Sequence, residues 1–406
     1  MIHQQRLPRL YLRLGCFVLA ILLLWPLPFW LNHSRILVQA SPFVTICVIL
    51  AGGTFQMGFI LGLGFFLIAL ARKRWFCRHI CPVGLLLDGV AGIGLQKKSW
   101  WARCPSIGRY VALLTVAGSV AGYPLFLWMD PLALFNSAFS VYNATNLLSG
   151  VFSLMGLTIL LLMALTSGNL WCARVCPLGG TQELLASIKS IFSSPGKAKT
   201  LQPQETVKVG NTFSSTRRAF LAIVAGVGLG LWAGRNDLEP SVSPPLRPPG
   251  AIEEDEFTGQ CVRCGNCMRA CPSKIIHPDT GQAGIMRLLA PVVRYEKEYC
   301  IEDCNACTKV CPSGALQNLS LRQKHRYVIG EALLDASLCF LVRGVNDCDI
   351  CMRSCPFDAV QIYWDEDLYV AYPVVDPSKC NGCGACEVYC PTGDVKAIRV
   401  WKSAKA

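Results

Sequence analysis

Long apolar stretches dominate the first 234 positions of the chain, with polar residues gathered in the segments between them. Four stretches are nearly free of charge and reach the length of about 20 residues that a helix needs to cross a bilayer. They cover residues 14–31, 43–70, 111–129 and 147–167, and a shorter apolar run follows at 219–234. The pattern predicts an α-helical membrane domain with four to five transmembrane helices.

The pattern changes after this region. Residues 238–256 hold five prolines and end in the acidic run Glu253–Glu256, which is typical of a stiff, solvated spacer. Beyond it, short segments alternate with cysteines. We therefore divide the chain into a membrane domain, a linker with the fifth helix, the spacer and a cysteine-rich domain, at 1–185, 186–236, 237–260 and 261–400.

Composition supports this division. The chain has 406 residues, 52% of them hydrophobic and 16% charged, with a mean hydropathy of +0.40, which excludes a disordered or collagen-like chain and is too apolar for an ordinary soluble enzyme. Residues 1–218 hold 19 Lys and Arg against 4 Asp and Glu, whereas 219–406 hold 19 against 22. Because the basic residues cluster between apolar runs, they do not indicate nucleic-acid binding.

The same basic residues predict a topology. The segments 1–13, 71–109 and 171–218 carry 3, 8 and 7 Lys and Arg, whereas 32–42 carries one and 130–149 none. By the positive-inside rule, the N-terminus and the ends of the second and fourth helices face the cytoplasm.

Two similar cysteine motifs occupy those cytoplasmic ends. They run from Trp75 to Gly84 and from Leu170 to Gly179, both read aromatic-Cys-x3-Cys-Pro-x-Gly, and they lie 95 residues apart. An internal repeat would bring the two pairs to one membrane face, where four thiolates could hold an iron–sulfur cluster or another metal, or each pair could act as a dithiol. The candidate redox or metal residues are Cys77, Cys81, Cys172 and Cys176.

Isolated cysteines need no such explanation. Cys16, Cys47 and Cys104 have no partner at a repeated spacing, and we interpret them as small apolar fillers.

A possible export signal precedes the fifth apolar run. Residues 216–221 read Thr-Arg-Arg-Ala-Phe-Leu, which resembles a twin-arginine signal, and no small-x-small cleavage site follows. We expect 219–234 to be an uncleaved helix that places the rest of the chain in the periplasm. An interfacial helix that leaves the C-terminal domain in the cytoplasm is the alternative.

Sixteen of the 23 cysteines follow residue 260 in four motifs, each ending in Cys-x2-Cys-x3-Cys-Pro. In the first and last motifs the opening gap is two residues, as in bacterial ferredoxins, and in the other two it is longer. The motifs are Cys261, Cys264, Cys267, Cys271; Cys300, Cys304, Cys307, Cys311; Cys339, Cys348, Cys351, Cys355; and Cys380, Cys383, Cys386, Cys390.

This spacing predicts four [4Fe-4S] clusters in an α+β polyferredoxin domain made of two dicluster ferredoxin-like modules. Three cysteines of a motif hold one cluster and the fourth reaches the neighbouring cluster. Adjacent motifs could pair, or the first could pair with the last in a nested arrangement. A disulfide framework or zinc sites would not require this spacing four times.

At these motifs the chain resembles known families. Residues 1–185 resemble the NapH type of membrane polyferredoxin, and 212–400 resemble the ferredoxin-type proteins NapG and MauM, through the twin-arginine segment, Leu246–Ala251 and the Cys339-x8-Cys348 opening. The resemblance implies a quinol dehydrogenase module in the bacterial inner membrane. Such a module passes electrons from the quinol pool to a periplasmic cytochrome or terminal reductase, such as nitrate reductase.

Three functions follow as hypotheses. The first is electron transfer from quinol through four clusters to a periplasmic partner, with lipid around the membrane half. The second is a maturation factor that delivers electrons or metal to a partner enzyme. A redox-sensing membrane regulator is a third, against which the absence of a recognisable flavin-binding domain argues. Quinol oxidation needs a proton acceptor, for which His33, His79, Asp88 and Asp130 lie near predicted membrane boundaries, although capping or snorkelling is the more common role of such residues.

Overall fold

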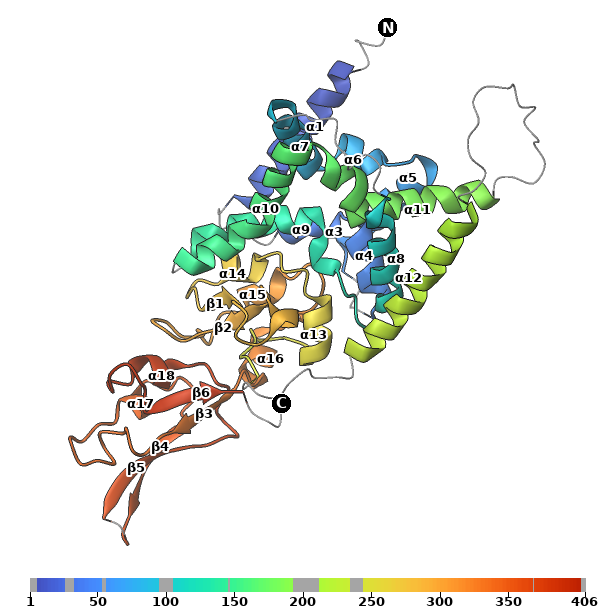
Figure 1. Ribbon diagram of the computed structural model, residues 1–406. Coiled ribbons are helices and arrows are strands. Elements are labelled where there is room, and N and C mark those ends of the chain that lie inside the picture. Colours follow the sequence, from blue (N-terminus) through green and yellow to red (C-terminus); the bar gives the residue numbers. More distant parts are fainter. Residues whose placement is uncertain are drawn as a thin grey trace, which may run out of the picture.

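Helices make up the first part of the chain and small helices with short strands the second (Figure 1). A computed structural model describes residues 6–25, 33–52, 56–94, 105–144, 147–192, 212–233, 244–367 and 369–402. We call the described residues up to 233 the helical half and those from 244 the ferredoxin half. Cys104, His3, the linker residues 193–211 and the spacer residues 237–243 lie outside the described ranges.

The helical half consists of short and medium helices. Its α-helices are α1 (Arg6–Leu24), α3 (Arg35–Gln39), α4 (Pro42–Leu50), α5 (Phe59–Ala71), α6 (Trp75–His79), α7 (Pro82–Ile93), α8 (Ile107–Val120), α9 (Pro131–Ala138), α10 (Leu147–Ser167), α11 (Pro177–Phe192) and α12 (Thr212–Ala233). Shorter turns are η2 (Leu127–Met129), η3 (Phe139–Asn143) and the π-helical η4 (Trp171–Val175).

The predicted four to five transmembrane helices are wrong for the described residues. Only α10 among them is long and apolar enough to cross a membrane, and α5, α7 and α8 are apolar but too short. The stretch 43–70 is divided between α4 and α5, with Gly52 in a left-handed conformation (φ +78°) after α4. Likewise 111–129 leaves α8 at Val120 and turns at Gly122 (φ +86°).

The other two predicted spans coincide only in part with apolar helix. The stretch 14–31 falls in α1, which ends at Leu24 and carries arginines in its first half, while residues 26–31 lie outside the described ranges. The run 219–234 falls in α12, which is 22 residues long but includes Arg217 and Arg218. At 43–70 and 111–129, hydropathy does not show where the apolar stretch turns, because a glycine in a left-handed conformation can end a helix without any charged side chain.

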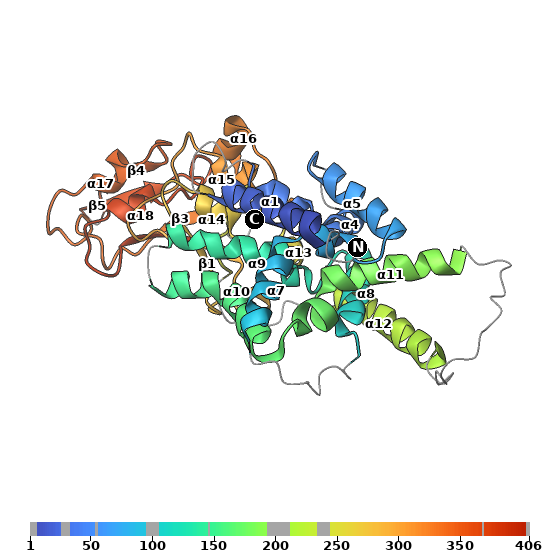
Figure 2. The ribbon, with the colours of Figure 1, turned by 90° about the horizontal axis from the view of Figure 1, so that it is seen from above.

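Glycines let α12 pack closely along α8 (Figure 2). A Cβ at Gly226 would lie 2.5 Å from the Leu114 carbonyl oxygen, and one at Gly230 would lie 3.1 Å from the Gly118 Cα. The export-like segment at Arg217 therefore belongs to a helix that packs against α8.

The ferredoxin half contains thirteen elements within its described residues. These are α13 (Glu254–Gln260), α14 (Asn266–Ala270), β1 (Ile276–Pro278), η5 (Ile285–Arg287), β2 (Pro291–Val293), α15 (Ala306–Lys309), α16 (Leu321–Arg326), β3 (Glu331–Leu334), α17 (Ile350–Arg353), β4 (Val360–Asp365), β5 (Val370–Val375), α18 (Ala385–Tyr389) and β6 (Ile398–Trp401).

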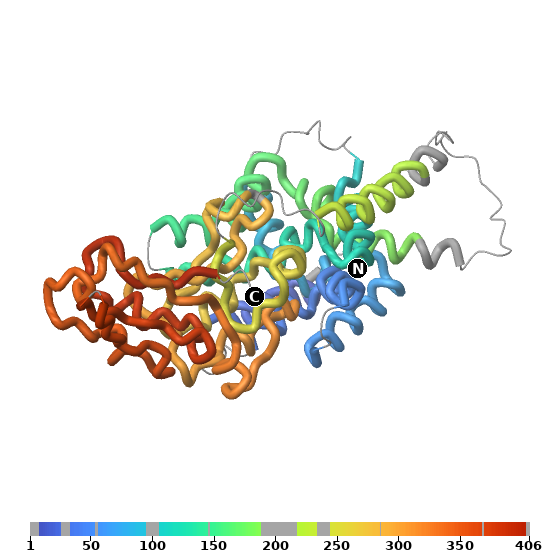
Figure 3. The backbone as a smooth tube through the Cα atoms, turned by 90° about the horizontal axis from the view of Figure 1, so that it is seen from below, coloured from blue at the N-terminus to red at the C-terminus, as the bar shows by residue number. Residues whose placement is uncertain are grey.

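Its strands form three antiparallel pairs, β1–β2, β3–β6 and β4–β5. We call residues 244–330 the first module and 331–402 the second. The first module contacts the helical half, and the second extends away from it (Figures 1 and 3). The two halves have separate apolar cores, except that Val262 and Cys264 of the first module belong to the core of the helical half.

A buried ion-pair network connects separate segments of the first module. The Arg247 guanidinium, 3% exposed, donates to both Glu254 carboxylate oxygens and to the Pro291 carbonyl oxygen. Arg287 and Lys402 approach the same carboxylate at 3.1 and 3.5 Å. Glu254 therefore ties the segment Leu246–Ala251 to strand β2 and to the C-terminal end of β6.

Candidate iron–sulfur sites

The sixteen cysteines of the ferredoxin half gather in four groups of four. Three of the groups each line one interior cavity, and in the fourth Cys386 is within electrostatic reach of the other three cysteines. Set 1 is Cys261, Cys264, Cys267 and Cys311; set 2 is Cys271, Cys300, Cys304 and Cys307; set 3 is Cys339, Cys348, Cys351 and Cys390; set 4 is Cys355, Cys380, Cys383 and Cys386.

This grouping is the adjacent arrangement, not the nested one. The first three cysteines of a motif stay together, and the fourth joins the set of the neighbouring motif: Cys311 lies in set 1 and Cys271 in set 2. The exchange repeats in the second module, where Cys390 lies in set 3 and Cys355 in set 4.

The donor sets fit iron–sulfur clusters better than single ions. In the part of the chain that the structure describes, no three His, Cys, Asp or Glu side chains come close enough to hold one metal ion. A zinc site needs its sulfurs about 2.3 Å from a single ion, whereas the cysteines of sets 1, 2 and 3 each line a common cavity, as the ligands of a cluster do. Each [4Fe-4S] cluster, when bound, stores and releases one electron.

Local backbone geometry shapes each set. In motifs one and four a left-handed glycine, Gly265 (φ +74°) or Gly384 (φ +84°), caps the helix that carries the third cysteine. A Cβ at Gly384 would lie 2.4 Å from the Tyr295 ring, and one at Gly265 would lie 2.8 Å from Ser140. Glycine is therefore required here for close packing as well as for backbone conformation.

Hydrogen bonds to sulfur surround the fourth cysteines. The Leu316 N–H points at the Cys311 sulfur and the Ala359 N–H at the Cys355 sulfur, both at 3.3 Å, and the Thr392 hydroxyl lies 3.1 Å from the Cys390 sulfur. Hydrogen bonds of this kind tune cluster potentials. Sequence reasoning missed Thr392, although a Ser or Thr two residues after the fourth cysteine recurs at Ser273 and Ser313.

Burial keeps the bare thiols neutral. Burial raises the pKa of the Cys261 thiol to about 11 and that of the Cys264 thiol to about 12. Iron must therefore displace protons when it binds these side chains.

The four sets follow one another in the order 1, 2, 4, 3. Helix α14, which carries Cys267 of set 1, packs against α15, which carries Cys307 of set 2. Between the modules, the Cys300 N–H donates to the Cys383 carbonyl oxygen at 2.9 Å, and the Tyr295 hydroxyl donates to the Gly382 carbonyl oxygen at 2.6 Å. In the second module α18, which carries Cys386 of set 4, packs against α17, which carries Cys351 of set 3.

Set 1 lies directly against the helical half. The buried Arg269, on the helix that carries Cys267, donates to the Leu24 carbonyl oxygen at 2.9 Å and to the Asn136 side chain at 2.7 Å. Burial lowers the pKa of the Arg269 guanidinium to about 10, so it remains a cation at neutral pH. Asn143 donates to the Met268 and Arg269 carbonyl oxygens.

A second group of contacts holds the other side of set 1. Gln39 and Gln56 donate to the Pro312 and Cys311 carbonyl oxygens at 3.1 and 3.3 Å, and Arg35 donates to the Lys309 carbonyl oxygen. Polar side chains from α3, η3 and α9 therefore fix the first module on the helical half. Sequence patterns do not predict such pairings.

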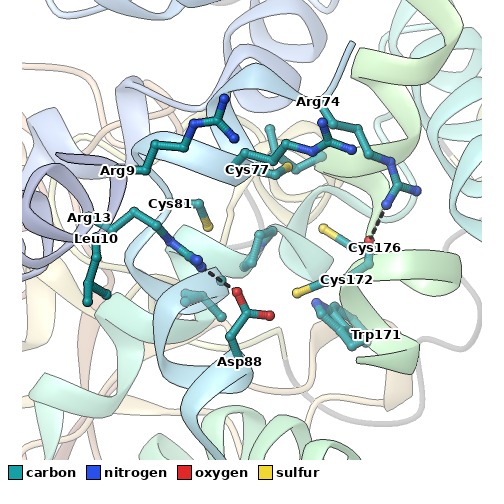
Figure 4. A pocket seen from close by; sticks show the side chains of 15 residues that line it. Arg9, Leu10, Arg13, Arg74, Cys77, Cys81, Asp88, Trp171, Cys172 and Cys176 are labelled. Carbon is teal, nitrogen blue, oxygen red and sulfur yellow. Dashed lines mark hydrogen bonds and ion pairs between the residues drawn. The ribbon is translucent and has the colours of Figure 1, made fainter. Parts of the chain in front are cut away.

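The two Cys-x3-Cys motifs of the helical half meet around one cavity of about 520 Å³ (Figure 4). Cys77 is in α6 and Cys172 in η4, while Cys81 and Cys176 precede the prolines that begin α7 and α11. We call this the four-cysteine cavity.

Basic side chains surround the four-cysteine cavity. Arg9, Arg13, Arg74 and Arg78 line it. Arg74 links the two motifs, because it donates to the Cys172 and Ala173 carbonyl oxygens and pairs with Glu183 at 2.7 Å. The Gln182 amide donates to the Cys77 sulfur at 3.0 Å. With these four arginines against one lining carboxylate, that of Asp88, the cavity suits a negatively charged group bound by the cysteines.

The predicted proton acceptors have structural partners. Asp88 pairs with Arg13 at 2.6 Å and accepts from Asn169. Asp130 caps α9 and accepts from the Ser41 hydroxyl at 2.7 Å. His79 contacts the Trp75 carbonyl oxygen and stacks on its ring, and His33 lies in the turn before α3.

The remaining described cysteines are isolated from these groups. Cys47 is fully buried in the core of the helical half, and Cys16 is partly buried in α1.

Comparison with known proteins matches these sites. A family model described as "4Fe-4S dicluster domain" matches residues 260–315 and 346–393, and one described as "4Fe-4S binding domain" matches 54–100 and 149–195. The former ranges hold most of the cysteines of sets 1 to 4, and the latter hold the four cysteines of the four-cysteine cavity. No solved structure matches the chain.

Curated relatives are ferredoxin-type proteins. The methylamine utilization ferredoxin-type protein MauM of Methylobacillus flagellatus is 36% identical over 193 residues, which are 46% of this chain and 79% of MauM. MauM of Methylorubrum extorquens is 34% identical over 43% of this chain and 80% of that protein. The ferredoxin-type protein NapG of Haemophilus influenzae is 32% identical over 41% of this chain and 62% of NapG.

The fold and the sites thus define an iron–sulfur protein of the dicluster ferredoxin class, consistent with a role in electron transfer. Within that class, the chain belongs to the family of the ferredoxin-type protein MauM, and NapG is a relative.

Proposed function

We propose that this protein relays electrons from a membrane quinol, which reacts at the helical half, to a separate redox protein at the far end of the ferredoxin half. One observation carries the proposal: the four cysteine sets form a single series, with set 1 against the helical half and set 3 in the second module. If the two modules held separate, unconnected sets, electrons would have no continuous path from the helical half to the far end of the ferredoxin half.

Quinol supplies two electrons and loses two protons when it becomes quinone. Each [4Fe-4S] site carries one electron, so a relay of such sites divides the pair into single electrons for two molecules of a one-electron partner. The partner would be a periplasmic cytochrome or the electron-accepting site of a terminal reductase.

Exposed apolar side chains support a lipid environment for the helical half. Leu147 is 85% exposed, Ile93 86%, Val120 66% and Phe220 65%. Exposed apolar patches of this kind mark interaction surfaces, and α10 is long and apolar enough to span a bilayer. We place the protein at the bacterial inner membrane.

Helix α1 and the export-like segment support one orientation of the protein in the membrane. Arg13 of α1 lines the four-cysteine cavity and Leu24 of the same helix contacts Arg269, so cavity and ferredoxin half lie toward opposite ends of α1. The twin-arginine-like residues Arg217 and Arg218 support a ferredoxin half on the periplasmic side and a four-cysteine cavity on the cytoplasmic side.

We also propose a fifth cluster in the four-cysteine cavity. The matched "4Fe-4S binding domain" ranges and the four lining arginines support it. This site would lie at the opposite end of the helical half from set 1.

The test is an anaerobic reduction of the purified protein by a quinol analogue, followed by electron paramagnetic resonance, with iron counted per chain. We expect about twenty iron atoms, four per site, and a fall to about sixteen in a Cys77→Ser, Cys172→Ser double variant. A Cys16→Ser variant is the matched control and should keep the full count. Clusters that dithionite reduces but quinol does not would refute the quinol relay and favour a maturation role.

A further inference from the structure

The second module carries an acidic surface around set 3. Residues 335–376 contain eight Asp and Glu against two Lys and Arg, in a chain whose overall formal charge is +12. One of the two cations, Arg353, is already paired with Asp349. The loop 340–349, which carries Cys348, and the β4–β5 hairpin hold most of these acids.

The far end of the β4–β5 hairpin exposes side chains on both of its faces. Consecutive strand residues point to opposite faces, yet Tyr363 is 57% exposed and Trp364 is 53% exposed. Tyr369, at the start of the return strand, is 79% exposed. Aromatic side chains surrounded by charge are typical of protein interfaces.

This surface lies next to set 3. Pro373 of β5 and Phe340 of the loop line the same cavity as Cys348 and Cys351. Both sets of the second module have partly exposed cysteines, but set 4 is also joined to set 2 through Cys383. Set 3 is therefore the end of the series.

We propose that the loop 340–349 and the β4–β5 hairpin form the docking surface for the electron acceptor, and that this acceptor is a one-electron redox protein with a basic face. The proposal rests on the relay described above. For each quinol oxidised, two acceptor molecules each gain one electron across this surface. Opposite charges speed the encounter of such partners and orient them.

Charge excludes two other occupants. A symmetric contact between two copies would place this acidic surface against itself, which like charges disfavour. Anionic lipid headgroups would repel it as well.

The test compares two triple variants that remove the same charge. The docking variant is Asp347→Asn, Glu366→Gln, Asp367→Asn, all three exposed positions. The control, in the first module, is Glu296→Gln, Glu298→Gln, Asp303→Asn, whose side chains are also exposed. The probe acceptor is a basic cytochrome c, mixed in a stopped-flow instrument with protein reduced beforehand and freed of reductant.

We expect the docking variant to reduce cytochrome c about tenfold more slowly than wild type at low salt, with the difference lost at high salt. The control should stay within about twofold of wild type. Carbodiimide cross-linking gives a second readout, because it joins carboxylates to lysines: cross-links should map to 347 and 365–367 in the wild-type complex.

Equal slowing of both variants, or cross-links elsewhere, would overturn the proposal. Reduction of the iron–sulfur sites by the quinol analogue, recorded without cytochrome c, separates this result from the relay. Normal quinol reduction with no effect of the docking variant refutes the docking surface alone. Failed quinol reduction refutes the relay, while prereduced protein still tests the surface.

Discussion

At the residue scale, a few side chains and glycines decide whether the cysteine sets can form. Gly384 turns the chain between Cys383 and Cys386 and lies against Tyr295, whose hydroxyl also holds the Gly382 carbonyl oxygen. The junction between the two modules therefore depends on close packing of the Tyr295 ring against Gly384, which has no Cβ.

Gly384→Ala should remove the metal from set 4. The new Cβ would meet the Tyr295 ring at 2.4 Å in a backbone conformation that L-residues rarely adopt. Iron analysis should show a loss of about four atoms per chain. Gly344→Ala is the control, because Gly344 has φ +63° but no atom within 4 Å of a new Cβ. Equal iron loss in both variants would assign the effect to backbone strain, not to the Tyr295 contact.

Glu254 is the second decisive residue. Burial alone would raise the pKa of its carboxyl, but the hydrogen bonds from Arg247 and the charges of Arg247, Lys402 and Arg287 outweigh burial and lower it below 4.5. Because the folded carboxylate resists protonation more than the unfolded one, its contribution to stability is present above pH 4.5 and is lost as the pH falls through the lowered pKa.

Glu254→Gln should therefore destabilise the first module by about 3 kcal/mol at neutral pH, since it leaves buried Arg247 without its anion. Anaerobic denaturant unfolding measures this. The difference between wild type and variant should shrink on acidification below pH 4.5. Glu256→Gln, at an exposed position of the same helix, should change stability by less than about 0.5 kcal/mol. A constant difference between wild type and Glu254→Gln across this pH range would contradict the assignment.

At the element scale, the sequence predicts some features well and others poorly. Cysteine spacing predicts the α+β ferredoxin half, because each Cys-x2-Cys-x3-Cys-Pro run must turn tightly around one site. The repeat at Cys77 and Cys172 correctly indicates that the two motifs come together. Apolar runs overestimate helix length, because Gly52 and Gly122 end helices inside stretches that hydropathy reads as continuous.

Contacts between elements that are far apart in the sequence cannot be predicted from local sequence patterns. Arg269 and Asn136 are 133 residues apart, and nothing local marks either as a partner of the other. The twin-arginine-like segment is similar: its place in α12, packed along α8, depends on glycines that fit a helix far away in the sequence.

Gly226→Leu should separate α12 from α8. Its side chain would meet the Leu114 carbonyl oxygen, with an overpacking cost of about 1–3 kcal/mol. Protease cleavage in the segment before α12 should become faster. Gly228→Leu, on the same helix with no atom within 4 Å of a new Cβ, is the matched control. Unchanged cleavage of the Gly226 variant would show that the α12–α8 contact does not hold the helix.

At the scale of the whole molecule, the protein joins a helical half rich in exposed apolar side chains to a series of four iron–sulfur sites. Set 1 is fixed by Arg269, Asn143 and Gln39, and set 3 lies beyond the module junction at Cys300 and Cys383. On the proposed function, each half alone would lack either a donor site or a path to an acceptor. The order of the sets is what makes the two halves one electron-transfer unit.

The most direct test of this account interrupts the series at set 2. In a Cys304→Ser, Cys307→Ser variant, rapid-freeze electron paramagnetic resonance would follow reduction by a quinol analogue, with a Cys348→Ser, Cys351→Ser variant as control. The account predicts that sets 4 and 3 stay oxidised in the first variant on the wild-type time scale, while the control still reduces sets 1, 2 and 4. Reduction of sets 3 and 4 at the wild-type rate without set 2 would contradict it.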